Sequence, residues 1–278
     1  MIAFTSTRNS RRVRAVAGFS LVELAIVIGL ITLLLGSVLV PLQSQVESRK
    51  LSDTEKILDN AREALLGYAA ANGYFPCPAD FAGGSSGAEA TGYNHATGSC
   101  PATVTGGGTA GVYIGYLPAV TLGFTPIDSS GYAVDAWGGT TGRIRYAVSS
   151  TTVNAITLPF TRTTGMKSAI MSNILSATLL SVCNAAPSPA SATACNPAAS
   201  TSLTSNAIVV IWSLGANAGT TGGTSTDEAK NAQALASADR VFVTRDKSTT
   251  SGSEFDDVVT WISPPLAFTR LLASSQLP

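Results

Sequence analysis

The Gly18–Phe19 peptide bond and the carboxylate of Glu23 are the groups in this chain whose types and spacing could do chemistry together. Gly18 lies between a basic segment and an apolar run that extends to Val40. Cleavage after Gly18 would remove the basic segment and leave Phe19 with a free amine. An unpaired carboxylate inside an apolar run is costly, but an amine of a neighbouring subunit can neutralise it. We therefore expect Glu23 to favour assembly of the helices in one register.

The apolar run is the element that must position these groups. As a helix, residues 19–40 would be about 33 Å long at about 1.5 Å per residue, enough to cross a hydrocarbon core of about 30 Å. Four arginines and no acidic residue precede the run, which predicts a cytoplasmic N-terminus and export of everything after the helix. The sequence thus predicts a single-pass inner-membrane protein with a periplasmic C-terminal domain. The arginines are Arg8, Arg11, Arg12 and Arg14.

The segment GFSLVE, residues 18–23, followed by the apolar run resembles the N-terminus of type IV pilins, including the pseudopilins of type II secretion. The resemblance implies cleavage by a prepilin peptidase after Gly18, N-methylation of Phe19 and an assembly role for Glu23. It also implies other pilin or pseudopilin subunits, an inner-membrane assembly platform and the membrane itself as partners, with a filament as the final state. A plain membrane anchor with an incidental acid is the alternative interpretation.

Four cysteines follow the apolar run, and charged residues make up only 12% of the chain. An even number of cysteines on the exported side predicts two disulfides. We expect Cys77 to pair with Cys100 and Cys183 with Cys195, because each pairing closes a loop rich in Gly, Ser and Pro. The spacing lacks the C-x₂-C pairs of a zinc site. No basic patch with interleaved aromatic residues is visible, which argues against a nucleic-acid partner.

The predicted fold class is α+β, with a long N-terminal helix packed on an antiparallel β-sheet in the manner of a pilin. The division is a leader over 1–18, the transmembrane helix over 19–40, an amphipathic continuation over 41–72 interrupted at Pro41, and a periplasmic head over 73–278. Alternation over 143–149 places Tyr146 and Val148 on one face of a strand. The other strands are expected at 112–117, 132–137, 207–214, 240–245 and 257–263, with helical segments at 168–183 and 266–273.

Asp135 opens the run DAWGG, which resembles the DxWG segment of major pseudopilins and favours the secretion branch of the family. Major pseudopilins bind calcium in a C-terminal loop, and oxygen ligands of acidic side chains suit that ion. The acidic residues of this chain match no calcium motif, and a solvated loop is the plainer interpretation, so we expect no cofactor, with calcium as the alternative. The candidate ligands are Glu254, Asp256 and Asp257, with Asp227 and Glu228 as a second acidic pair.

No catalytic group emerges from the sequence. His95 is the one histidine of the chain, and we expect it to be an exposed loop residue without a role. The chain is therefore predicted not to be an enzyme but a structural subunit, a pseudopilin or minor pilin, of a type II secretion or type IV pilus filament. Two alternatives remain open: a tip adhesin whose Ser/Thr/Gly-rich loops contact a surface, and an anchored protein that does not assemble.

Overall fold

A computed structural model describes most of the chain, which divides into two compact units, Met1–Ser48 and Arg49–Pro278. Side chains are not described for residues 36–43, 106–107 and 233–237. The described residues are 18, 20–81, 86–101, 104–107, 110–153, 155–156, 159–188, 191, 193–196, 200–220 and 225–277.

Helix α1, Leu21–Asn72, is the longest element and contributes to both units. Its helical backbone continues through Pro41, so the predicted interruption there is wrong. Proline removes one hydrogen bond of a helix, but its φ is compatible with helical backbone. The helix ends at Asn72, and the N–H of the following Gly73 donates to the Ala69 carbonyl at 2.7 Å. Gly73 has a φ of 83°, a left-handed conformation that glycine adopts without steric cost.

The predicted fold class is wrong in its membrane-spanning half. Within the described part of the chain, no helix combines the length and the apolar character that crossing a membrane requires. A spanning helix needs about 20 consecutive apolar residues. The described apolar side chains at the start of α1 run from Leu21 to Leu35. The predicted single-pass inner-membrane location is overturned by the same finding.

The second unit contains a five-stranded antiparallel sheet in the order β1-β2-β3-β6-β8. The strands β2, β3, β6 and β8 lie within ranges that the sequence predicts. The central pair is β3 with β6, where Tyr146 lies opposite Ile211. The bounds are β1 Thr105–Gly107, β2 Val112–Tyr116, β3 Arg145–Ser149, β6 Val209–Ser213 and β8 Val258–Ile262.

A second, three-stranded sheet has the order β5-β4-β7. Its strands are β4 Leu180–Cys183, β5 Ser202–Ala207 and β7 Val241–Val243. Strands β4 and β5 are antiparallel, whereas β4 and β7 are parallel. The α+β class and the antiparallel sheet are confirmed by the five-stranded sheet, whereas the second sheet, with its parallel β4–β7 pair, was not predicted.

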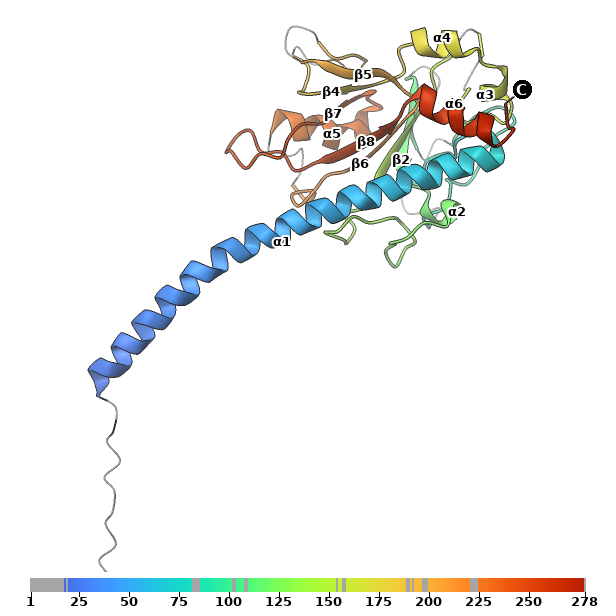
Figure 1. The fold of residues 1–278 in the computed structure, drawn as a ribbon. Helices are drawn as coiled ribbons and strands as arrows, with labels where there is room; N and C mark the ends of the chain where they lie inside the picture. Colours follow the sequence, from blue (N-terminus) through green and yellow to red (C-terminus); the bar gives the residue numbers. More distant parts are fainter. Residues whose placement is uncertain are drawn as a thin grey trace, which may run out of the picture. The chain divides into compact units, whose positions relative to one another are not determined.

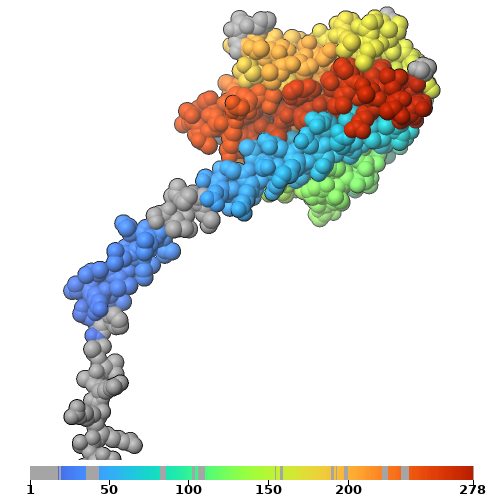
Figure 2. Space-filling model, viewed as in Figure 1, coloured from blue at the N-terminus to red at the C-terminus, as the bar shows by residue number. Residues whose placement is uncertain are grey.

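The two sides of the five-stranded sheet form two cores. Tyr146 and Ile211 pack on one side with Leu65 of α1 and with α6, Pro264–Ala273. Trp212 packs on the other side with Phe242 of β7. The predicted alternation of β3 is confirmed, because Tyr146 and Val148 share the first core. Figure 1 shows the C-terminal part of α1 running along the head with α6 beside it, and Figure 2 shows the same two helices in contact at the surface.

Several local predictions differ from the structure. Residues 132–137 form isolated bridges and turns instead of a strand. The helix predicted over 168–183 is split into α3, α4 and the strand β4, because Ala169 and Ala177 are extended. Helix α5, Thr226–Ser237, was not predicted. The short helices are α2 Ala119–Leu122, α3 Gly165–Ser168 and α4 Met171–Ser176.

Candidate functional site

The start of α1 contains the residues that the sequence singles out for processing and assembly. Gly18 is exposed, while Phe19 and residues 1–17 lie outside the described residues, so cleavage and methylation stay predictions. The Ser20 Oγ accepts a hydrogen bond from the Glu23 backbone N–H at 3.1 Å. A serine followed three residues later by glutamate is typical of a capping box, and an acid in the first turn also suits the helix dipole. The Ser20 side chain thus caps the start of α1, a role that the sequence did not lead us to predict.

Large apolar side chains are exposed around this end of α1. Leu21 is 86% exposed, Leu33 is 73% exposed and Leu34 is 63% exposed. Consecutive residues of a helix point in different directions, so these side chains surround the helix and do not form a stripe. In the second unit the same helix behaves differently, because Leu58 and Leu65 are fully buried in the head.

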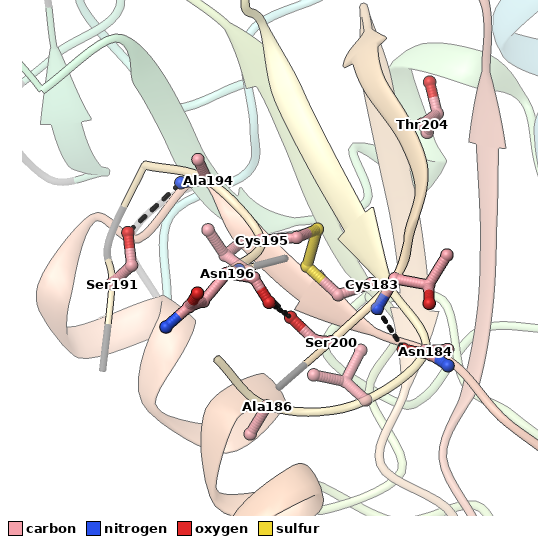
Figure 3. Close-up of a disulfide and its surroundings, with 12 residues drawn as sticks. Cys183, Asn184, Ala186, Ser191, Ala194, Cys195, Asn196, Ser200 and Thr204 are labelled. Carbon is pink, nitrogen blue, oxygen red and sulfur yellow. Dashed lines mark hydrogen bonds between the residues drawn. A yellow bond between two sulfur atoms is a disulfide. The ribbon is translucent and has the colours of Figure 1, made fainter. Parts of the chain in front are cut away.

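The cysteines are joined as neighbours along the chain. Cys77 is bonded to Cys100, and Cys183 is bonded to Cys195. Figure 3 shows the second disulfide joining the end of β4 to the loop that precedes β5. Because each sulfur is part of a disulfide, none is available as a thiolate ligand, which removes the zinc alternative.

The DxWG segment forms a turn that is organised by Asp135. The Asp135 Oδ1 accepts hydrogen bonds from the backbone N–H groups of Trp137 at 2.9 Å and Gly138 at 3.0 Å. Its other oxygen accepts from the Ser213 hydroxyl at 2.5 Å, which ties the turn to the end of β6. Burial raises the pKa of Asp135 in spite of these hydrogen bonds, which act in the opposite direction. The segment has a clear structural role in this head.

The strongest cluster of ligand-type side chains joins the first turn of α5 to the start of β8. Carboxylate oxygens of Glu228, Asp256 and Asp257 all lie within 4.8 Å of one another. Glu228 is 1% exposed and Asp257 is 6% exposed, so the cluster is not the solvated loop that the sequence suggests. Glu254, the third predicted ligand, is not part of this group. Its place is taken by Glu228, which the sequence analysis assigned to a separate acidic pair.

Hydrogen bonds hold the three carboxylates in place but do not satisfy all their oxygens. The two carboxylate oxygens of Glu228 accept from the Asp256 backbone N–H at 3.2 Å and from the Asn217 amide at 2.9 Å. The Asp257 Oδ2 accepts from the Asn231 amide at 2.7 Å. The remaining oxygens of Asp256 and Asp257 are buried, and neither has a hydrogen-bond partner among the described residues.

The electrostatics of the cluster disfavour three negative charges. Burial and then the charges of Glu228 and Asp256 raise the pKa of Asp257 well above its ordinary value. Burial and then Glu228 raise the pKa of Asp256 as well. Buried carboxylate oxygens that lack partners fit a hard divalent cation such as calcium, which prefers oxygen ligands. Asp256 and Asp257 also line a pocket of about 380 Å³, together with Glu55 and Asp59 of α1.

A second buried acid, Glu89, meets the histidine that the sequence analysis expected to be exposed. The His95 side chain is 10% exposed, and its Nε2 lies 3.1 Å from the Glu89 Oε1. The expectation for His95 is wrong because three segments of the chain fold over it. The Cys77 backbone N–H also donates to the Glu89 Oε1, at 2.5 Å. The Cys77 sulfur is in a disulfide and cannot act as a thiolate ligand, so Glu89, His95 and Cys77 do not form a three-ligand metal centre.

Searches among protein-family models, curated proteins and solved structures found no match to this chain.

Proposed function

We propose that this protein is a structural subunit of a filament of the type IV pilin and type II pseudopilin class. In this proposal a prepilin peptidase cuts after Gly18, Phe19 becomes the methylated N-terminus, and copies assemble through the start of α1. The observation that carries the proposal is the exposure of large apolar side chains around α1 from Leu21 to Leu35. A helix that is apolar all round is stable only when it is covered, and identical helices of neighbouring subunits would cover one another.

The carboxylate of Glu23 would favour an ordered filament over a disordered aggregate of helices. Apolar packing alone does not define how far one helix is shifted along another. The carboxylate of Glu23 would pair with the Phe19 ammonium of an adjacent subunit once both are removed from water, and an unpaired partner would be costly. The pair therefore selects one register. Before assembly, the same carboxylate is exposed at the first turn of α1.

The proposal is tested by the N-terminus and the assembly of the protein in cells. Mass spectrometry of the mature protein should find N-methyl-phenylalanine at residue 19. Glu23→Ala should be cleaved normally yet be absent from sheared or cross-linked filaments. Glu47→Ala, the same substitution at another exposed glutamate of α1, should assemble like the wild type. A mature protein that keeps residues 1–18, or a Glu23→Ala variant that assembles normally, would contradict the proposal.

A second proposal concerns the acidic cluster, which we infer to hold calcium. Glu228 from α5 and the pair Asp256 and Asp257 before β8 would supply the carboxylate ligands, and the bound ion would neutralise their mutual repulsion. The observation that supports it is the pair of buried, unpartnered oxygens on Asp256 and Asp257. Calcium here would join two segments of the head and have no part in catalysis.

Isothermal titration of the EDTA-treated protein with calcium chloride tests this second proposal. We expect saturable binding that is lost in Asp257→Asn. Asp53→Asn is the matched control, because Asp53 lies on the exposed face of α1 in an ion pair with Lys56. Equal calcium binding by the wild type and Asp257→Asn would exclude the cluster as the site.

A further inference from the structure

Three side chains of types that bind metals meet inside the loop that the Cys77–Cys100 disulfide closes. The Cys77 Sγ, a carboxylate oxygen of Glu89 and a ring nitrogen of His95 all lie within 4.8 Å of one another. Cys77 is fully buried, and the side chains of Glu89 and His95 are only 4% and 10% exposed. Their spacing in the sequence matches no zinc motif, so the group is formed by the folding of the loop.

The His95 Nε2 is a buried polar atom that has no hydrogen-bond partner among the described residues. The Glu89 Oε1 lies 3.1 Å from it, and this oxygen already accepts a hydrogen bond from the Cys77 backbone N–H. Two ligand atoms on one tetrahedral zinc ion, each about 2.0–2.1 Å from the metal, lie about 3.3 Å apart. The separation of Nε2 and Oε1 is therefore close to that of two ligands on one ion.

The other nitrogen of the imidazole ring is held by the backbone. The His95 Nδ1 lies 2.9 Å from the Thr161 carbonyl oxygen. A histidine that binds a metal through one ring nitrogen usually donates the other N–H to a carbonyl or carboxylate, which fixes the direction of the ring. The His95 carbonyl also accepts from the Thr163 N–H at 2.9 Å, which fixes the backbone at this point. The ring is thus oriented for Nε2 to act as a ligand.

Reduction of the disulfide would add the thiolates that such a site needs. A thiolate of a dithiol reductant attacks the Cys100 Sγ, the less buried of the two sulfurs, and Cys77 leaves as a thiolate. The second thiol of the reductant then attacks the mixed disulfide, which frees Cys100 and leaves the reductant as a cyclic disulfide. Two electrons pass to the protein, and the thiol protons of the reductant are released when a metal binds the cysteine sulfurs.

We propose that, once this disulfide is reduced, the loop binds a structural zinc ion. Its ligands are the Cys77 and Cys100 thiolates, the His95 Nε2 and a Glu89 carboxylate oxygen. Thiolate, imidazole and carboxylate are the ligand types of tetrahedral zinc sites. All four ligands lie between residues 77 and 100, so the ion closes the same loop as the disulfide and keeps it folded in both redox states. This inference goes beyond the proposed filament function and does not depend on it.

Cobalt(II), a spectroscopic substitute for zinc, tests the site in the full-length protein. The protein is reduced with dithiothreitol, freed of reductant without air, and titrated with cobalt chloride. We expect one cobalt per chain, with a thiolate-to-cobalt charge-transfer band that one equivalent of zinc chloride removes. The oxidised protein should show no such band. Absence of the band from the reduced protein, or an equal band in the oxidised protein, would overturn the proposal.

Substitutions then assign the ligands. Because the chain has one histidine, His95→Ala removes every imidazole and should weaken zinc binding by more than about 100-fold, since loss of an outer-shell partner alone costs about 10–100-fold. The matched control replaces both Cys183 and Cys195, the other disulfide pair, by serine and should bind zinc like the wild type. Unchanged binding by His95→Ala, or loss of binding in the control, would contradict the assignment.

Limited proteolysis of the reduced wild type needs no substitution and gives a second measurement. Zinc chloride at 100 times its dissociation constant should slow cleavage between residues 77 and 100 by about 100-fold relative to EDTA, because the opened loop cannot bind the ion. Equal rates of cleavage in zinc and in EDTA would show that no ion closes this loop.

Discussion

Glu89 and Asp257 are both buried carboxylates of the head, yet their charges are compensated in different ways. Glu89 accepts a backbone hydrogen bond and lies 3.1 Å from a ring nitrogen of His95. Asp257 accepts one amide hydrogen bond and lies near the carboxylates of Glu228 and Asp256. Burial raises its pKa most, and the charges of these carboxylates raise it more than the charge of Arg145 lowers it. The chain itself supplies a donor for the Glu89 carboxylate, whereas a proton or a cation would relieve the repulsion among the carboxylates around Asp257.

The largest effect is expected from removing the buried carboxylate of Glu89. Glu89→Ala would leave the buried Cys77 N–H without its acceptor, at a cost of about 3 kcal/mol. Urea unfolding followed by circular dichroism measures this loss. A cost below about 1 kcal/mol would mean that water replaces the carboxylate, and that the hydrogen bond is not a structural element.

The next largest effect is expected from adding calcium, which we propose binds the acidic cluster. Calcium at 100 times its dissociation constant should raise the free energy of unfolding by about 2.7 kcal/mol. Thermal melting of the wild type with calcium and with EDTA measures the gain, which should vanish in Asp257→Asn. Asp53→Asn should keep the full gain, and a calcium effect of the same size in both variants would place the ion elsewhere.

Replacing Asp257 should have a smaller effect on stability, and of opposite sign to that of replacing Glu89. Without calcium, Asp257→Asn should stabilise the head by about 1 kcal/mol at pH 7, because it removes one of three repelling charges and its amide can donate to the neighbouring carboxylates. The raised pKa of Asp257 means that the wild type loses stability as the pH rises from about 4 through that pKa, as the carboxyl ionises. Asp257→Asn should flatten this part of the profile, and a destabilised variant with an unchanged pH profile would contradict the account.

The smallest effect on stability is expected from replacing an exposed acid, because water already surrounds its charge. Glu63 on α1 and Arg270 on α6 form an ion pair at 2.6 Å, and their side chains are about half exposed. Glu63→Gln should cost less than about 1 kcal/mol, and raising the salt concentration should reduce the difference further. Urea unfolding at low and high salt checks this, and a salt-independent loss of several kcal/mol would show that the pair is more shielded than its exposure suggests.

The predictable parts of the fold are those whose signal is local. The alternation around Tyr146 identifies β3 and its buried face, and the apolar run at residues 207–214 contains β6. Strand β5 was missed because SLTSNA has no apolar alternation and takes its strand conformation from pairing with β4. Helix α5 was missed because its side chains are mostly small or polar, and residues such as Asn231 stabilise it by hydrogen bonds to distant backbone.

The sequence alone predicts the neighbour pairing of the cysteines and the buried face of β3, because each depends on residues close together in the chain. The position of Glu228 beside Asp256 and Asp257, and that of His95 between two tyrosines and Glu89, emerge only in the folded chain. The environment of a buried side chain is set by the groups that lie near it in space. Those groups come from separate segments, whose order in the chain carries no sign of their contact.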